Sequence, residues 1–132
     1  MRQAAIDTNA FLRLLLDDIP SQAKEVEKIL EQAKKLNIKL HVAQIVIFEL
    51  NFILDKYYHF PKNEIINKLK SVVQTPYLDI QDREVFIVSL KVFADNNISL
   101  ADSFILAKSK IENWELFTFD RNLQKYLLRH HR

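Results

Sequence analysis

Hydrophobic residues recur along the chain with two spacings, which together predict strands alternating with helices. Short apolar runs predict strands over residues 2–6, 38–42, 77–80 and 115–119. Apolar positions at helical spacing predict helices over about 9–16, 20–37, 44–58, 61–73, 82–95, 99–113 and 121–129. Strands that alternate with helices are typical of a parallel sheet covered on both faces. We therefore expect an α/β fold.

Acidic residues follow two of the expected strands directly. Asp7 comes after the first strand and Asp120 after the fourth. Ligands of open parallel sheets bind beyond the carboxyl ends of the strands, where the strand order reverses. If these two strands are neighbours, as in an order 3-2-1-4, both carboxylates lie in one crevice. Asp102 opens the helix before the fourth strand and Glu49 lies in the third helix, so four acids from four segments could converge.

Three of these acids have a simpler interpretation as helix caps. Asp7 and Asp120 each follow a strand and precede a helix, which is the position of an N-cap. Asp102 is the last residue of Ser99-Leu100-Ala101-Asp102, which has the form of a capping box. Taken alone, each of the three could be structural.

Glu49 is harder to explain as a structural residue. It lies within Ile45-Val46-Ile47-Phe48-Glu49-Leu50-Asn51-Phe52, a helix that is apolar on most sides and is therefore expected to be buried. A carboxylate in such surroundings is costly unless a cation or a metal accompanies it. The alternatives to a metal are a salt bridge to lysine or arginine, or a position at the rim that reaches solvent.

Composition excludes several kinds of site. The chain has no glycine, which excludes Gly-rich phosphate-binding and dinucleotide-binding loops, and no cysteine, which excludes disulfides and thiolate zinc sites. His41 and His59 are isolated in sequence, and no histidine pair has zinc-site spacing. Without glycine, helix ends that need a left-handed residue must use asparagine, and Asn37, Asn97 and Asn113 fall where helical patterns stop.

Length and charge indicate one small globular protein. We expect residues 1–132 to form a single domain, since 48% of them are hydrophobic and 27% are charged. The absence of cysteine, of an N-terminal signal peptide and of a membrane-spanning segment predicts a soluble protein of the cytoplasm. A net charge of +2 does not indicate nucleic-acid binding, although residues 121–132 contain four basic residues and no acid. That segment could equally be a solvated helix face.

Four motifs in order resemble the PIN-domain family. They are Ile6-Asp7-Thr8-Asn9, Phe48-Glu49-Leu50, Leu100-Ala101-Asp102-Ser103-Phe104-Ile105-Leu106-Ala107 and Leu116-Phe117-Thr118-Phe119-Asp120. The likeness covers essentially the whole chain and is greatest to the toxin ribonucleases of VapBC toxin–antitoxin pairs. It implies a three-layer α/β/α domain with a central parallel sheet of four to five strands. Asn113 departs from the glycine that the family often has before its last core strand.

The resemblance implies a metal-dependent endoribonuclease that hydrolyses RNA phosphodiester bonds. Asp7, Glu49, Asp102 and Asp120 would be its catalytic and Mg²⁺- or Mn²⁺-binding residues, with Asn9 and Thr118 supporting the acids. Carboxylate oxygens suit these hard ions, whose waters can serve as nucleophiles. An acidic pocket repels RNA, so basic residues must hold the phosphates, and the candidates are Arg13, Lys108 and Arg121.

The resemblance also implies partners, namely RNA, a cognate antitoxin and a second copy of the chain in a homodimer. Two other functions stay open, which are an RNA-processing housekeeping nuclease and a catalytically inactive PIN domain that serves as a binding module. The absence of an appended RNA-binding domain favours the toxin. A phospho-accepting receiver domain and a haloacid dehalogenase phosphatase are excluded, because their acidic motifs after the first strand are missing.

Overall fold

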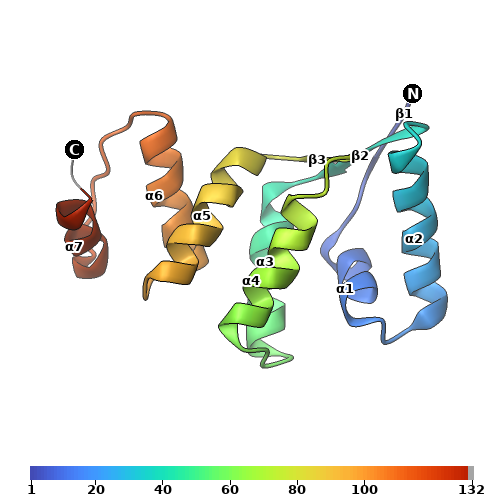
Figure 1. The fold of residues 1–132 in the computed structure, drawn as a ribbon, viewed down its shortest axis with the longest axis horizontal. Coiled ribbons are helices and arrows are strands. Elements are labelled where there is room, and N and C mark those ends of the chain that lie inside the picture. The colour runs from blue at the N-terminus through green and yellow to red at the C-terminus, as the bar shows by residue number, and fades with distance from the viewer. Residues whose placement is uncertain (131–132) are drawn as a thin grey trace. The chain divides into compact units, whose positions relative to one another are not determined.

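Strands and helices alternate along the first two thirds of the chain, as the sequence predicts (Figure 1). The computed structural model describes residues 1–130, which form three strands and seven helices. The chain divides into two units, Met1–Arg83 and Glu84–Arg132. Unit 1 contains β1 (Arg2–Ala5), α1 (Thr8–Leu16), α2 (Pro20–Lys34), β2 (Ile38–Val42), α3 (Gln44–Lys56), α4 (Lys62–Val73) and β3 (Leu78–Ile80). Unit 2 contains α5, which begins at the boundary (Arg83–Asp95), α6 (Leu100–Ile111) and α7 (Arg121–Arg129).

Unit 1 is built on a parallel sheet with the strand order β1-β2-β3. Ala4 pairs with Leu40, and Leu40 pairs with Leu78. The amide of Ile6 donates to the carbonyl oxygen of His41 at 3.0 Å, which extends the pairing of β1 towards Asp7. Among the described strands, β1 has one neighbour, β2.

One face of the sheet is buried by the helices of unit 1. In β2, Leu40 and Val42 are buried, whereas Lys39 and His41 point to the exposed face. The helix α3 turns Ile47, Leu50 and Leu54 inwards, and all three are fully buried. Its other side is open, with Ile45 and Phe52 exposed, so the expectation that this helix is buried on most sides was wrong.

Unit 2 has a small apolar core of its own. Val92 of α5, Leu106 of α6 and Leu123 of α7 form a buried cluster. The rings of Phe86 and Phe104, whose centroids are 5.0 Å apart, join α5 to α6. The three amphipathic helices of unit 2 therefore bury their apolar side chains against one another, and no described strand takes part.

The fourth strand expected over residues 115–119 is absent from the described residues. This segment has no strand pairing, and the side chains of Phe117 and Phe119 are 82% and 85% exposed. The physical reason is that a strand needs a partner for its backbone hydrogen bonds, and unit 2 has no other described strand. Within residues 1–130 the sheet therefore has three strands, and the four to five that were expected are not shown.

Helix ends in this glycine-free chain use several residue types in the left-handed conformation. Asn113 has a φ of 58°, as expected, and follows α6 in a Schellman-type end. The expectation was wrong at Asn37 and Asn97, which do not have positive φ. After α2 the left-handed residue is Leu36, with a φ of 63°, because this helix ends one turn earlier than its apolar pattern indicates.

Leu36→Gly should raise the free energy of unfolding by about 1 kcal/mol, because a left-handed backbone costs a residue with a Cβ roughly that much. Little packing is lost, since Leu36 is 73% exposed. Urea denaturation measures the change. Leu36→Ala is the control, because alanine keeps the Cβ and should bring no gain. A glycine variant no more stable than the alanine variant would contradict this explanation.

Candidate functional site

Asp7 lies just beyond the carboxyl end of β1 and caps α1. Its Oδ1 accepts a hydrogen bond from the backbone amide of Ala10 at 2.9 Å. The carboxylate is exposed, and Oδ2 makes no hydrogen bond within residues 1–130. One carboxylate oxygen of Asp7 therefore caps the helix, and the other is available to a ligand.

Glu49 lies on the open side of α3, not in the apolar interior that the sequence suggested. The residue is exposed, and its Oε1 accepts a hydrogen bond from the hydroxyl of Thr8 at 2.7 Å. Thr8 itself is buried and directly follows Asp7. Of the alternatives for Glu49, a position that reaches solvent is the observed one, and no salt bridge to it occurs among the described residues. This hydrogen bond places Glu49 beside the turn that carries Asp7.

The other two acids lie in unit 2 at helix starts. Ser99 caps α6, with its Oγ accepting from the amide of Asp102 at 3.1 Å, so the cap is the serine. The side chain of Asp102 is half-buried and makes no hydrogen bond or ion pair within the described part of unit 2. Asp120 is exposed and caps α7, with Oδ1 accepting from the amide of Leu123 at 3.0 Å.

Thr118 holds the backbone that leads into Asp120. Its Oγ1 accepts a hydrogen bond from the amide of Asp120 at 3.0 Å, and its carbonyl oxygen accepts one from Nε2 of Gln124, also at 3.0 Å. These two contacts fix the turn before α7 from both sides. Thr118 is thus in a position to orient the carboxylate that follows it.

The four acids divide between the units, Asp7 and Glu49 in unit 1 and Asp102 and Asp120 in unit 2. Residues 1–130 contain no group of three or more histidine, cysteine, aspartate or glutamate side chains arranged to hold a metal ion. The donor chemistry of unit 1 nevertheless fits Mg²⁺ or Mn²⁺, which are bound through one or two carboxylates and keep several waters. Asp7 and Glu49 each have one carboxylate oxygen that no hydrogen bond within the described chain occupies.

Two of the three expected phosphate-binding residues already have ionic partners. Nη1 of Arg13 lies 3.1 Å from Oδ2 of Asp18, and Nζ of Lys108 lies 3.3 Å from Oε1 of Glu112. Arg121 is exposed at the first position of α7, next to Asp120 in sequence. Of the three, Arg121 is the one for which the described residues provide no ionic partner.

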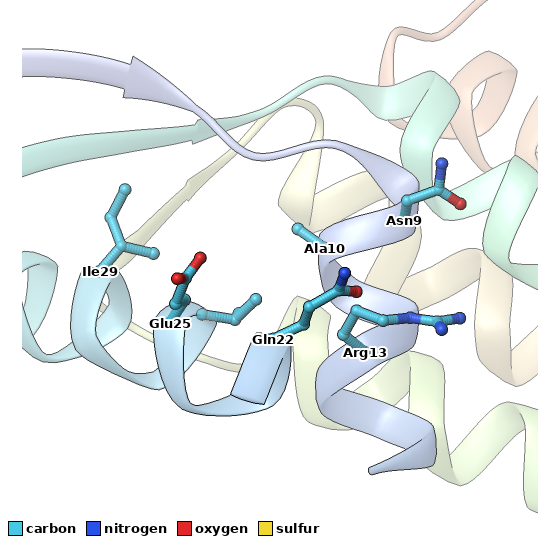
Figure 2. A pocket seen from close by; sticks show the side chains of 7 residues that line it. Asn9, Ala10, Arg13, Gln22, Glu25 and Ile29 are labelled. Carbon is cyan, nitrogen blue, oxygen red and sulfur yellow. The ribbon is translucent and has the colours of Figure 1, made fainter. Parts of the chain in front are cut away.

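Arg13 and Asn9 also line a pocket of about 640 Å³ between α1 and α2 (Figure 2). The Nε of Arg13 is buried and has no hydrogen-bond partner among the described residues. The sequence gives no sign of this pocket, because its wall on α2 consists of residues whose pattern indicates only an amphipathic helix.

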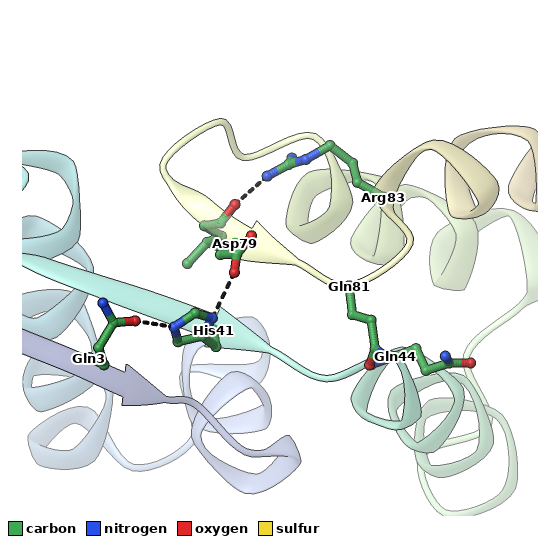
Figure 3. A network of polar contacts seen from close by, with 7 residues as sticks. Gln3, His41, Gln44, Asp79, Gln81 and Arg83 are labelled. Carbon is green, nitrogen blue, oxygen red and sulfur yellow. Dashed lines mark hydrogen bonds and ion pairs between the residues drawn. The ribbon is translucent and has the colours of Figure 1, made fainter.

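His41 is not isolated, although its position in the sequence suggested so. Its Nδ1 lies 2.6 Å from Oδ2 of Asp79 and its Nε2 lies 2.5 Å from Oε1 of Gln3, across all three strands (Figure 3). His41 and Asp79 are direct cross-strand partners. Such pairs on one face stabilise a sheet, so this network is a structural feature of the exposed face.

One comparison identifies a family. The PIN domain model matches residues 4–126, which extend through both units. No curated protein matches the chain in sequence. No described helix is long and apolar enough to span a lipid bilayer.

Proposed function

The chain belongs to the PIN-domain family, whose members are generally nucleases that act on RNA with divalent metal ions, and on this premise we propose a metal-dependent endoribonuclease. Its catalytic and metal-binding residues are Asp7, Glu49, Asp102 and Asp120, and its metal is Mg²⁺ or Mn²⁺. We also propose that residues 1–132 form one PIN domain, and a family match over residues 4–126 that crosses the boundary between the two units supports this.

The observation that carries this proposal is the hydrogen bond from Thr8 to Glu49. It joins residues 41 positions apart in sequence and brings the carboxylate of α3 to the turn that holds Asp7. The bond orients the carboxylate of Glu49 and occupies only one of its two oxygens. Two acids held at the carboxyl end of a parallel sheet are what a hard cation requires.

We further propose that residues 115–119 form a fourth strand, so that the domain has three layers and a central parallel sheet of four to five strands. Phe117 and Phe119, which alternate with Leu116 and Thr118, have the pattern of a strand and are highly exposed without one. Pairing would satisfy the backbone groups of this segment. Asp120 would then follow the carboxyl end of a strand, as Asp7 does.

Each residue of the proposed site can then be given a role in RNA cleavage. A bound Mg²⁺ or Mn²⁺ supplies charge that offsets the phosphate and promotes ionisation of water. Asp7, Asp102 and Asp120 bind this ion directly or through water. Glu49, held by Thr8, binds the ion or orients the attacking water. Asn9 and Thr118 position the acids, and Arg121 contacts the RNA phosphate.

The direct test is cleavage of single-stranded RNA by the purified chain. We expect cleavage with Mg²⁺ or Mn²⁺ and none after EDTA is added in excess. Cleavage that continues unchanged in EDTA would overturn the proposed chemistry.

We also propose that the chain is the toxin of a type II toxin–antitoxin pair in the cytoplasm, with an antitoxin as partner and a homodimer as its assembly. An aromatic patch of Phe52, Tyr57 and Tyr58 at the end of α3 supports a protein partner, because exposed apolar groups of this kind often mark interfaces. The rings of Phe52 and Tyr57 are in edge contact, with centroids 6.5 Å apart. Tyr57 is 72% exposed.

Replacing this patch should dissociate the homodimer. We expect light scattering at micromolar concentration to give a dimer for the wild type and a monomer for Phe52→Asp/Tyr57→Asp, because each charge would have to be desolvated in the interface. Leu128→Asp is the control, since Leu128 is 80% exposed but lies on α7. A wild type that is monomeric, or a dimer that the double substitution leaves intact, would contradict this interface.

A further inference from the structure

The pocket between α1 and α2 is lined by polar side chains that have no role in the proposed cleavage reaction, among them Gln22 and Glu25. Its volume of about 640 Å³ falls within the range of roughly 300–1,000 Å³ that is usual for small-ligand sites. Its walls come from both helices, and they consist of Asn9, Ala10, Arg13, Gln22, Glu25, Val26 and Ile29 (Figure 2). Asn9 is two residues from Asp7, so the pocket begins beside the candidate site.

The polar groups of the pocket are a mixed set of donors and acceptors. Asn9 and Gln22 contribute carboxamides, each of which both donates and accepts hydrogen bonds. Glu25 contributes a further acceptor. A ligand whose edge both donates and accepts hydrogen bonds matches these groups.

The charges of the pocket argue against a phosphate ligand. The guanidinium of Arg13 is already paired with Asp18 at 3.1 Å, and the carboxylate of Glu25 would repel an anion. The remaining surface is aliphatic, with Val26 buried and Ile29 half-buried, and such surface can cover the flat face of a ring. A neutral planar group with several hydrogen-bonding edges fits this combination.

We infer that the pocket binds one unpaired nucleobase of the RNA, next to the bond that is cut, which rests on the proposed ribonuclease function. Proteins read single-stranded RNA by taking bases out of the stack and bonding to their edges. Glu25 accepts from an exocyclic amino group, as acidic residues do with cytosine, and carboxamides pair with adenine. The pocket therefore prefers a base with an amino group, adenine or cytosine, over uracil.

The inference can be tested without cleavage, by NMR titration of the ¹⁵N-labelled chain in EDTA with AMP, CMP, UMP and ribose 5-phosphate. We expect AMP or CMP to shift the side-chain amide signals of Asn9 and Gln22, and UMP and ribose 5-phosphate to leave them in place. Glu25→Ala should weaken that binding about tenfold, because it removes the acceptor for the amino group of the base. Glu27→Ala is the matched control, with the same change on α2 outside the pocket.

Two results would overturn the inference. If ribose 5-phosphate produces the same shifts as AMP or CMP, the pocket is an anion site. If no mononucleotide moves these signals, the pocket does not bind a base. RNA cleavage with Mg²⁺ is measured on the same preparation. If the chain cleaves RNA but binds no mononucleotide, the base-binding inference is wrong and the proposed ribonuclease function still stands. If the chain binds AMP or CMP but does not cleave RNA, the proposed ribonuclease function is wrong instead.

Discussion

Asp7→Asn should reduce RNA cleavage on the order of 100- to 1,000-fold and leave the stability of the chain nearly unchanged. The loss is that of a charged group which stabilises the transition state through the metal. Stability is kept because asparagine caps helices as well as aspartate does, and its oxygen can accept the same bond from Ala10. Initial rates with Mn²⁺ measure the first quantity, and urea denaturation in EDTA measures the second.

Asp7→Ala separates the two roles of this residue. It removes the cap as well as the charge, so it should lose the same activity and also about 1 kcal/mol of stability. Asp55→Asn is the control for a general effect of charge, since Asp55 is an exposed acid on α3 whose partner is the neighbouring Lys56. It should change neither quantity. Full activity in Asp7→Asn would show that Asp7 is only a cap.

The boundaries of most elements follow from the sequence, because local periodicity and helix-end residues determine them. The expected strand over 38–42 and the helix that begins at Pro20 are found as predicted. The strand predicted over residues 115–119 is absent from the described residues, and local sequence could not have shown this. Its alternating pattern is that of a strand, but a strand exists only when a partner supplies hydrogen bonds, and a pattern within five residues cannot specify that partner.

The candidate site could be predicted as a set of residues but not as a geometry. Asp7 and Asp120 could be recognised as strand-end acids, whereas the contact of Thr8 with Glu49 depends on how α3 packs against α1. The exposure of Glu49 was misjudged because apolar residues surround it in sequence. Ile45, Glu49 and Phe52 share one face of the helix at spacings of four and three residues, and that face is the open one.

Thermal stability with and without Mn²⁺ tests whether Glu49 and Asp102 bind the proposed metal ion, independently of RNA cleavage. A ligand that binds only the folded state stabilises it, by about 2.7 kcal/mol when its concentration is 100 times its Kd. We therefore expect millimolar Mn²⁺ to raise the melting temperature of the wild type above its value in EDTA. Glu49→Gln and Asp102→Asn should each lose most of that increase, since each removes one charged ligand.

The same two variants should be no less stable than the wild type in EDTA. If the four acids converge, their charges repel one another when no metal is bound, and removing one charge should stabilise the chain, by about 1 kcal/mol. Gln at position 49 can still accept the hydrogen bond of Thr8, and Ser99 still caps α6 in Asp102→Asn, so neither substitution removes a structural contact. Asp55→Asn should keep the full response to Mn²⁺. A loss of most of the Mn²⁺ response in both variants would support Glu49 and Asp102 as ligands of the proposed ion. If Mn²⁺ raises the melting temperature of all variants equally, these acids do not bind the ion, and the proposed site is wrong.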